Sequence, residues 1–371
     1  MSWDTEAPEY PFRLGLIHRD QPTRQDLALA RIYLERAVEL NPHNWRYRLE
    51  LARLYEFSGL LGEAEEAYLK AIGLNPRSAL YRWRLANFYI RTGKLEDSFL
   101  EFQVALELDF AGYSRPCATL LWKAGTRERD IDAIWPEDRS ARLQLLHFMV
   151  EKQANHDYLG QEWTRLLEGP SPLSLQEGSF YIDYLLKEER HQEARAQWAS
   201  LAGVNGLKDR VFRQKHNLIW NGDFELPISG NTLDWKLSSS SAFAMKHQDQ
   251  YLEIDFLGND NLNFRGLEQR FIVDPGQGYS FAFKALSEEI STEQGIYFHV
   301  QDATTGATLL QTDPIRGTTP WTEYLDRINV PANSHLLSIS LKRRRSKRID
   351  NRLRGRFVLD WVVLKSPEAQ S

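Results

Sequence analysis

The sequence predicts a multidomain α + β protein, in which an all-α solenoid of helical hairpins is followed by an all-β sandwich. Two observations carry this prediction. Small and apolar residues recur with a 34-residue period between about residues 43 and 110, which indicates stacked helical hairpins. Beyond about residue 208, alternation with a period of two replaces the helical period, and turn residues separate short β-favouring segments.

The amino-acid composition is that of a globular protein and excludes only a few classes of function. The chain has 371 residues, 42% of them hydrophobic, which allows two or three domains. A net charge of -5 argues against a general nucleic-acid binder, so nucleic acid is not an expected partner. The single cysteine, Cys117, excludes an intrachain disulfide and a cysteine metal cluster. No apolar run reaches the roughly 18 residues that cross a bilayer, and residues 1–10 lack the pattern of a signal peptide.

The repeat is defined by residues that agree twice at the same spacing. The first unit has Leu51, Ala52, Tyr55, Gly59, Ala64, Tyr68, Ala71 and Pro76, and the second has Leu85, Ala86, Tyr89, Gly93, Ser98, Phe102 and Ala105. Small residues allow two helices to approach, and glycine makes the turn between them. This pattern resembles the tetratricopeptide repeat family.

We expect the helical solenoid to cover residues 9–205, with clear repeats at about 43–110, degenerate hairpins after them, and a linker at 206–216. The resemblance implies that the groove of the solenoid binds a protein partner. Three residues on the expected inner helices are candidates for this groove: Arg48, Arg84 and Asn87.

The predicted sandwich covers residues 217–366. Its expected strands are 218–225, 251–256, 279–286, 295–301, 321–330, 336–341 and 357–364. Seven short strands without helices are typical of a β-sandwich.

Both ends of the predicted sandwich carry motifs. The opening Asn217-Leu-Ile-Trp-Asn-Gly-Asp-Phe-Glu225 is followed by Asp234-Trp235, and the closing strand contains Leu359-Asp360-Trp361. These motifs resemble carbohydrate-binding modules with the galactose-binding-like jelly-roll fold. The layout of repeats followed by such a sandwich resembles bacterial tetratricopeptide proteins associated with exopolysaccharide or O-antigen production.

The carbohydrate-module resemblance implies a structural calcium ion between the first and last strands. Carboxylate oxygens suit this hard cation, and the matching positions are Glu225 and Asp360, with Asp223 as a further candidate. The alternative is that backbone amides or an arginine satisfy these carboxylates.

The same resemblance implies a glycan site. Sugar binding uses aromatic faces together with amides and carboxylates, which fix the hydroxyl groups. The candidates are Trp235, Trp321, Tyr297, Asn261, Asn263, Asp350 and Asn351. The alternative is that the aromatic residues belong to the core of the sandwich.

A basic run lies between the last two predicted strands. It contains Lys342, Arg343, Arg344, Arg345, Lys347 and Arg348. Such density in an acidic protein predicts a loop that binds an anionic ligand: an acidic polysaccharide, a lipid head group or nucleic acid. The alternatives are a solvated loop that prevents sheet-edge pairing, or arginines that dock onto the solenoid.

No GxSxG, HExxH, Walker or GxGxxG motif is present, so we expect a protein that is not an enzyme. The predicted function is an adaptor whose repeats bind a protein and whose sandwich binds a glycan, in exopolysaccharide or O-antigen assembly or export. The alternative is a structural scaffold whose sandwich has lost ligand binding; a glycan-modifying enzyme is a third possibility. The missing signal favours the cytoplasm, and the module resemblance favours the cell envelope.

Overall fold

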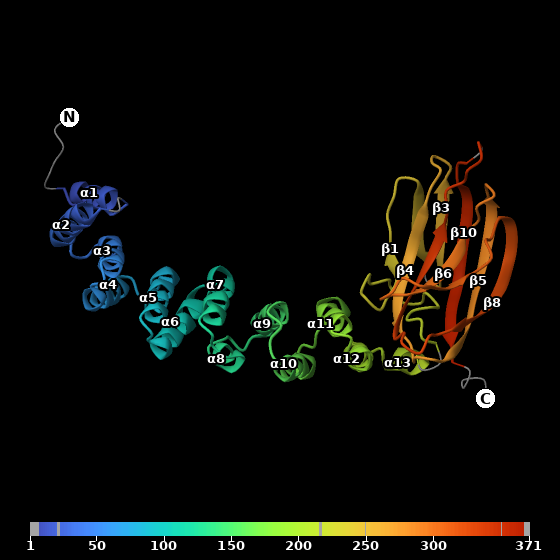
Figure 1. Cartoon of the computed structure of the whole chain (residues 1–371), viewed down its shortest axis with the longest axis horizontal. Coiled ribbons are helices and arrows are strands. Elements are labelled where there is room, and N and C mark those ends of the chain that lie inside the picture. The colour runs from blue at the N-terminus through green and yellow to red at the C-terminus, as the bar shows by residue number, and fades with distance from the viewer. Residues whose placement is uncertain (1–6, 21–22, 215–216, 249, 350, 367–371) are drawn as a thin grey trace. The chain divides into compact units, whose positions relative to one another are not determined.

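The computed structural model describes residues 7–20, 23–214, 217–248, 250–349 and 351–366. Helices occupy the first part of the chain and two antiparallel sheets the second, which confirms the predicted fold class (Figure 1). The chain divides into two compact units, residues 1–163 and 164–371. The second unit therefore contains the last helices together with the sandwich.

The helices are regular and are separated by short turns. In the first unit they are α1 (Glu9–Arg19), α2 (Arg24–Leu40), α3 (Trp45–Phe57), α4 (Leu61–Leu74), α5 (Ala79–Arg91), α6 (Leu95–Leu108), α7 (Phe110–Lys123), α8 (Glu128–Ala133) and α9 (Arg139–Glu151). Helix α10 (His156–Glu168) crosses the division between the units, and α11 (Leu175–Lys187), α12 (His191–Val204) and α13 (Lys208–Gln214) follow. Helix α13 thus lies within the segment that we expected to be a linker.

The repeat residues form the contacts between successive helices. Ala52, Ala64, Ala71 and Leu85 are fully buried and belong to one cluster with Tyr68 and Phe88. Gly59 and Gly93 occupy the same position in the two hairpin turns, with φ of 76° and 78°. A side chain strains this left-handed backbone, which explains glycine at these turns.

The sandwich consists of two five-stranded sheets. One has the strand order β1-β4-β9-β6-β7 and the other β2-β3-β10-β5-β8, with every strand antiparallel to its neighbours. The strands are β1 (Lys236–Leu237), β2 (Phe243–Gln248), β3 (Tyr251–Leu257), β4 (Phe264–Ile272), β5 (Gly278–Ile290), β6 (Tyr297–Asp302), β7 (Thr308–Gln311), β8 (Gly317–Asn329), β9 (Leu336–Arg343) and β10 (Arg354–Lys365).

The inner faces of the two sheets form one apolar core. Phe283 on β5 meets Phe298 on β6 edge to face, with ring centroids 4.8 Å apart. Six of the seven expected strands are present, whereas the expected strand at 218–225 is irregular. Its side chains do contribute to the core, since Ile219 and Phe224 are buried there.

The opening motif joins the first and last parts of the sandwich. Asn217 Nδ2 donates to the carbonyl of Val362 at 3.2 Å, and Asn217 Oδ1 accepts from the amide of Leu364 at 2.9 Å. The carbonyl of Gly222 accepts from the amide of Val362 at 2.7 Å. A Cβ atom on Gly222 would lie 2.2 Å from the Val362 carbonyl oxygen, so only glycine allows this approach.

Helices α12 and α13 pack against the sandwich within the second unit. Arg210 on α13 forms ion pairs with Asp223 and Glu225. His191 at the start of α12 stacks on His335, with ring centroids 5.2 Å apart. Across the described parts of the chain, no helix has both the length and the apolar character required to span a membrane.

Candidate functional site

A cavity of about 430 Å³ opens on the helical repeats between α3, α4 and α5. Its wall combines aromatic rings with charged groups and consists of Arg53, Glu56, Phe57, Tyr68, Trp83, Arg84, Asn87 and Arg91. Three of these side chains are cationic and one is anionic, so the wall carries a net positive charge. We call this set of eight residues the repeat groove.

Several donors in the repeat groove already have partners. Glu56 accepts from Arg91 Nε at 2.5 Å and from the Tyr68 hydroxyl at 2.8 Å. Arg53 Nη1 donates to Glu50 at 2.8 Å. The one acidic side chain of the groove is therefore neutralised, and the remaining charge is positive.

Two donors in the repeat groove have no hydrogen-bond partner among the described residues. Trp83 Nε1 and Arg84 Nε are both buried, and neither forms a hydrogen bond within the described structure. Arg84 also has no ion-pair partner among the described residues. A buried donor without a partner costs about 1–3 kcal/mol. An acceptor oxygen entering the groove would remove this cost.

Of the three residues predicted to line the groove, two do so in the structure and one does not. Arg84 and Asn87 line the repeat groove, and Asn87 Nδ2 donates to the Trp83 carbonyl at 2.6 Å. Arg48 is not part of the wall; its Nε donates to the Pro42 carbonyl at 3.0 Å. The sequence reasoning missed Arg53, which the repeat could have revealed, because Arg53 and Asn87 lie 34 residues apart at equivalent positions.

On the sandwich, an aromatic row lies on the outer face of the second sheet. Trp361 on β10 is opposite Lys284 on β5, which in turn is opposite Glu323 on β8. Trp321, two residues before Glu323 on the same face, is 45% exposed. Lys284 Nζ lies 5.4 Å from the Trp321 ring centroid and 2.8 Å from Asp360 Oδ2.

The other two aromatic candidates are buried. Trp235 has no exposed area, its Nε1 donates to the Asn221 carbonyl at 3.0 Å, and its ring stacks on Phe224. It is a core residue and cannot stack on a sugar in this structure. Tyr297 on β6 is 6% exposed, with Arg344 Cζ 6.0 Å from its ring centroid, so its face is also covered.

The polar glycan candidates lie near the end of the sandwich where β10 begins. Asn261 is committed to the fold, because it bonds with Arg343 and with the backbone of Ser346. Asn263 is exposed, and the Asn351 carbonyl accepts from Arg343 Nη2 at 3.4 Å. Asp350 lies outside the described residues. These groups do not gather beside Trp321.

Each of the three carboxylates expected to bind calcium pairs with a cationic side chain. Asp223 and Glu225 both pair with Arg210, and Asp360 pairs with Lys284. Among the described residues, no group of three or more acidic, histidine or cysteine side chains is placed to hold a metal ion. The pairing of Asp223 and Glu225 with Arg210 corresponds to the alternative in which an arginine satisfies the carboxylates.

The basic run divides into buried and exposed residues. Arg343 has no exposed area and donates to five oxygens, those of Gln294, Asn261, Leu262, Thr292 and Asn351. Burial lowers its pKa. Because all its donors are engaged within the fold, Arg343 is not an anion-binding residue.

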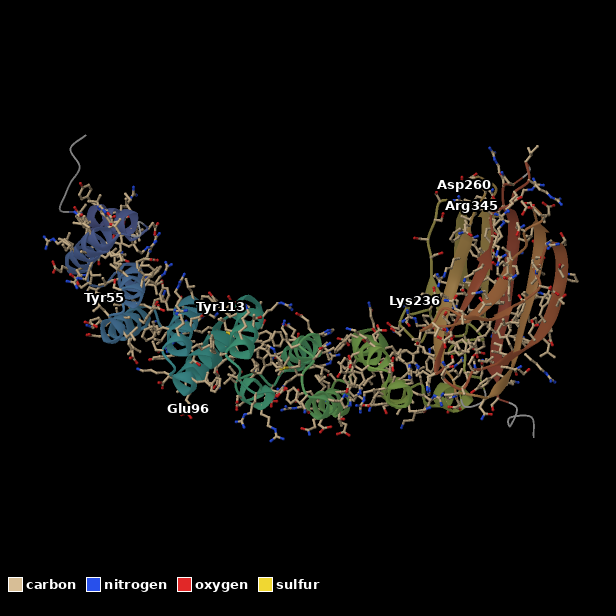
Figure 2. All side chains as sticks on the ribbon, viewed as in Figure 1. Tyr55, Glu96, Tyr113, Lys236, Asp260 and Arg345 are labelled. Carbon is tan, nitrogen blue, oxygen red and sulfur yellow. The ribbon has the colours of Figure 1, made fainter. Side chains whose placement is uncertain are left out.

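The neighbours of Arg343 are also partly engaged. Lys342 Nζ lies 2.9 Å from His299 Nδ1, and Arg344 Nη2 donates to Gln311 at 3.0 Å. Arg345, Lys347 and Arg348 are exposed, and Figure 2 shows Arg345 at the end of the sandwich. The anion-binding prediction is thereby narrowed to these three side chains.

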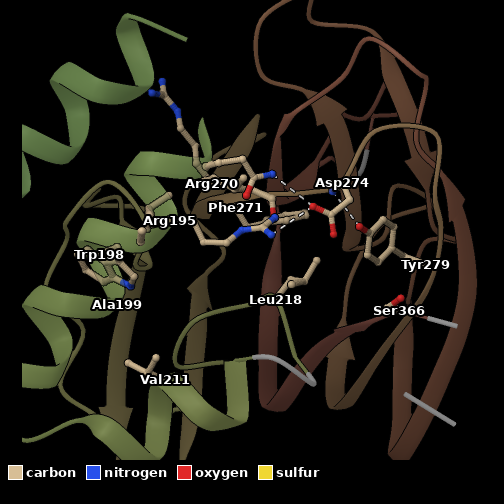
Figure 3. A pocket seen from close by; sticks show the side chains of 14 residues that line it. Arg195, Trp198, Ala199, Val211, Leu218, Arg270, Phe271, Asp274, Tyr279 and Ser366 are labelled. Carbon is tan, nitrogen blue, oxygen red and sulfur yellow. Dashed lines mark hydrogen bonds and ion pairs between the residues drawn. The ribbon is translucent and has the colours of Figure 1, made fainter. Parts of the chain in front are cut away.

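A second cavity, of about 520 Å³, lies between α12 and the sandwich (Figure 3). Arg195 on α12 donates to Asp274 at 3.2 Å and to the Ile272 carbonyl at 3.1 Å. The Asp274 amide in turn donates to the Tyr279 hydroxyl at 2.9 Å. These groups satisfy one another and fix the helix to the sheet, and the rest of the wall is mainly apolar.

Comparison with known proteins identifies the repeats in the first part of the chain. A family model described as tetratricopeptide repeat matches residues 12–79 and 49–110. The chain therefore contains tetratricopeptide repeats, as predicted, and these are protein-interaction scaffolds. A search of curated proteins found no match.

Solved structures resemble each part of the chain separately. One described as "CBM4 structure and function" is 15% identical, with 40% of this chain and 99% of that chain covered and a TM-score of 0.31. The TPR domain of Arabidopsis OM64 is 19% identical, covers 28% and 84%, and has a TM-score of 0.26. The first TPR of Spaghetti (RPAP3), bound to the HSP90 peptide SRMEEVD, is 17% identical, covers 33% and 93%, and has a TM-score of 0.29.

Proposed function

We propose that this protein is an adaptor whose repeat groove binds an acidic segment of a protein partner. The observation that carries the proposal is a pair of buried donors, Trp83 Nε1 and Arg84 Nε, which have no partner in the described part of the chain and lie in a groove of net positive charge. Carboxylates supply acceptors for both donors and complement the charge. Phe57 is 70% exposed at the same groove and offers an apolar contact to the segment.

A peptide titration tests this function. The probe is a fluorescein-labelled ten-residue peptide in which Glu alternates with Leu, and its counterpart has Gln in place of Glu. We expect the full chain to bind the Glu peptide at least about tenfold more tightly, because each charge-assisted hydrogen bond contributes about 1.5–3 kcal/mol. Added salt should weaken the binding.

Variants locate the binding on the groove. Arg84→Gln should weaken binding of the Glu peptide about tenfold, since it removes an arginine that has no partner within the described structure. The matched control is Arg129→Gln, which removes an exposed arginine from α8. Equal affinity for the Glu and Gln peptides, or equal effects of the two variants, would refute the proposal.

A second function, glycan binding, is favoured by the aromatic row on the sandwich. Trp321 presents an exposed ring, Trp361 is half-buried on the same face, and Lys284 with Asp360 supplies polar groups between them. Sugars bind to such combinations of aromatic faces and polar side chains. The structural-scaffold alternative requires that this row bind no glycan. A role in exopolysaccharide or O-antigen assembly or export rests on the layout resemblance alone.

Affinity electrophoresis in gels that contain alginate, dextran or a β-1,4-glucan tests the glycan function. We expect one of these polymers to retard the full chain, and Trp321→Ala to reduce the affinity about threefold to tenfold through the lost stacking. The control is Trp45→Ala, which removes an exposed tryptophan from α3. Unchanged mobility in all three polymers would favour the scaffold alternative.

A further inference from the structure

The end of the sandwich where β10 begins carries exposed cations around exposed aliphatic side chains. Ile349 is fully exposed (102%) and Leu257 is 52% exposed. Leu257 pairs with Arg354 across β3 and β10, which places it at this end. We call the following residues the basic tip: Leu257, Arg345, Lys347, Arg348, Ile349, Arg352 and Arg354.

Among the described residues, the cations of the basic tip outnumber the acids beside them. None of its five cationic side chains has an ion-pair partner among the described residues, and all five are exposed. Three acids lie at the same end: exposed Asp260, whose carbonyl accepts from the Leu353 amide and which Figure 2 shows with Arg345, exposed Glu289, whose backbone carbonyl lies beside Gly355, and Glu293, which accepts from the Ser346 hydroxyl. The positive charge of the described tip residues therefore exceeds the negative charge beside them.

A network beneath the tip holds the loop in place. The buried guanidinium of Arg343 bonds to three separate loops, through Leu262, Gln294 and Asn351. The Ser346 hydroxyl donates to Glu293 at 2.7 Å, and its amide donates to Asn261 at 2.8 Å. A loop fixed in this way loses little conformational freedom when it binds.

The basic tip lies away from the helices of its own unit. Strand β10 begins at Arg354 beside the tip and ends at Lys365, where the neighbouring Leu364 bonds to Asn217. Helix α13, held by Arg210 to Asp223, lies at that other end of the strands (Figure 1). The described helices of this unit therefore leave the basic tip uncovered.

We propose that the basic tip binds the surface of an anionic lipid bilayer. The cations contact lipid phosphates, and Ile349 and Leu257 enter the acyl boundary below the head groups. An acidic polysaccharide satisfies the cations equally well but offers no apolar interior to Ile349. A fully exposed isoleucine among cations therefore favours the bilayer. This proposal is independent of the repeat groove and of the aromatic row.

Vesicle sedimentation of the full chain tests the proposal. The probes are vesicles of phosphatidylcholine alone and vesicles with one quarter phosphatidylglycerol. We expect partition onto the anionic vesicles at least about tenfold above the neutral ones, because each basic residue near an anionic surface adds about a fivefold gain. High salt should abolish this preference.

Two pairs of variants separate the apolar and charged contributions. Ile349→Ser should weaken binding to anionic vesicles about tenfold, whereas Leu325→Ser, at a position 73% exposed on β8, should not. Arg345→Glu with Lys347→Glu should weaken it more than about a hundredfold. The control with the same charge change is Lys236→Glu with Arg327→Glu, both exposed elsewhere on the sandwich.

Three results would overturn the proposal. The first is equal binding to both kinds of vesicle. The second is equal loss in Ile349→Ser and Leu325→Ser. The third is that alginate retards the wild type and Ile349→Ser equally but does not retard the Arg345→Glu, Lys347→Glu variant. This result would assign the basic tip to an acidic polymer. Because the charged residues are exposed, these variants should keep the thermal transition of the wild type, which circular dichroism checks directly.

Discussion

Arg343 Nη1 donates to Asn261 Oδ1 at 3.2 Å, and the same oxygen accepts the amide of Ser346 at 2.8 Å. A single side-chain amide thereby joins the buried arginine to the loop that carries the exposed ones. Arginine suits this position because its planar group carries five donors in fixed directions. The most basic segment of the chain is consequently organised by one of its own residues.

Replacement of Arg343 should destabilise the sandwich. Arg343→Met leaves the carbonyls of Leu262 and Gln294 without this donor, and each acceptor that loses its hydrogen bond inside the protein costs about 1–3 kcal/mol. We expect a loss of about 3 kcal/mol in the free energy of unfolding, measured by urea denaturation of the full chain. Arg344→Met is the control, because Arg344 is exposed with one bond to Gln311, and it should change stability by less than about 0.5 kcal/mol. Similar effects of both changes would contradict the structural role of Arg343.

Gly222 should tolerate no side chain. The Cβ of Gly222→Ala would lie 2.2 Å from the carbonyl oxygen of Val362, so β10 or the opening segment must move. We expect a destabilisation of about 2–3 kcal/mol in the same urea experiment. Gly203→Ala on α12 meets only Lys208 Cγ at 4.0 Å and should be neutral or slightly stabilising. A neutral Gly222→Ala would show that the two ends of the sandwich do not meet as described.

The sequence predicted the architecture well because the relevant signals are periodic. The 34-residue spacing defines which faces of the helices meet, and alternation marked the strands around Phe281 and Phe357. Strand β4 escaped prediction because Gly266 and charged residues interrupt its apolar alternation. The opening segment was predicted as a strand because its apolar residues are typical of a buried strand. In the structure these residues are buried, but the backbone forms turns instead of a regular strand.

The candidate sites could be predicted only in part, because burial and pairing depend on tertiary structure. The sequence of the basic run does not distinguish the buried Arg343 from the exposed Arg345. Likewise, Trp235 and Trp321 are both tryptophans of the sandwich, yet one is core and the other is exposed. The ion pair of Lys284 with Asp360 joins two strands that are far apart in sequence. The sequence shows which charged and aromatic side chains are present, and the fold determines which of them are exposed to a ligand.

The contact between α12 and the sandwich should weaken in acid. His191 stacks on His335, and its pKa is lowered, first by burial and then by the charge of His335, with Glu189 acting in the opposite direction. A histidine whose pKa is lower in the folded protein binds a proton more readily when unfolded. Its contribution to stability is therefore complete above the unfolded pKa of about 6.5 and falls as the pH drops below that value.

Thermal melts of the full chain between pH 7.5 and pH 5, ~0.5 pH unit apart, measure this effect. His191→Gln removes the titrating group and should reduce the loss of Tm on acidification, while His43→Gln, an exposed histidine of the first unit, should leave it unchanged. Burial and the charge of Lys342 also lower the pKa of His299, so acid sensitivity will not vanish in His191→Gln. The double variant His191→Gln with His299→Gln should therefore have the flattest profile. A His191→Gln profile identical to that of the wild type would mean that the ring stack does not couple the helix to the sheet.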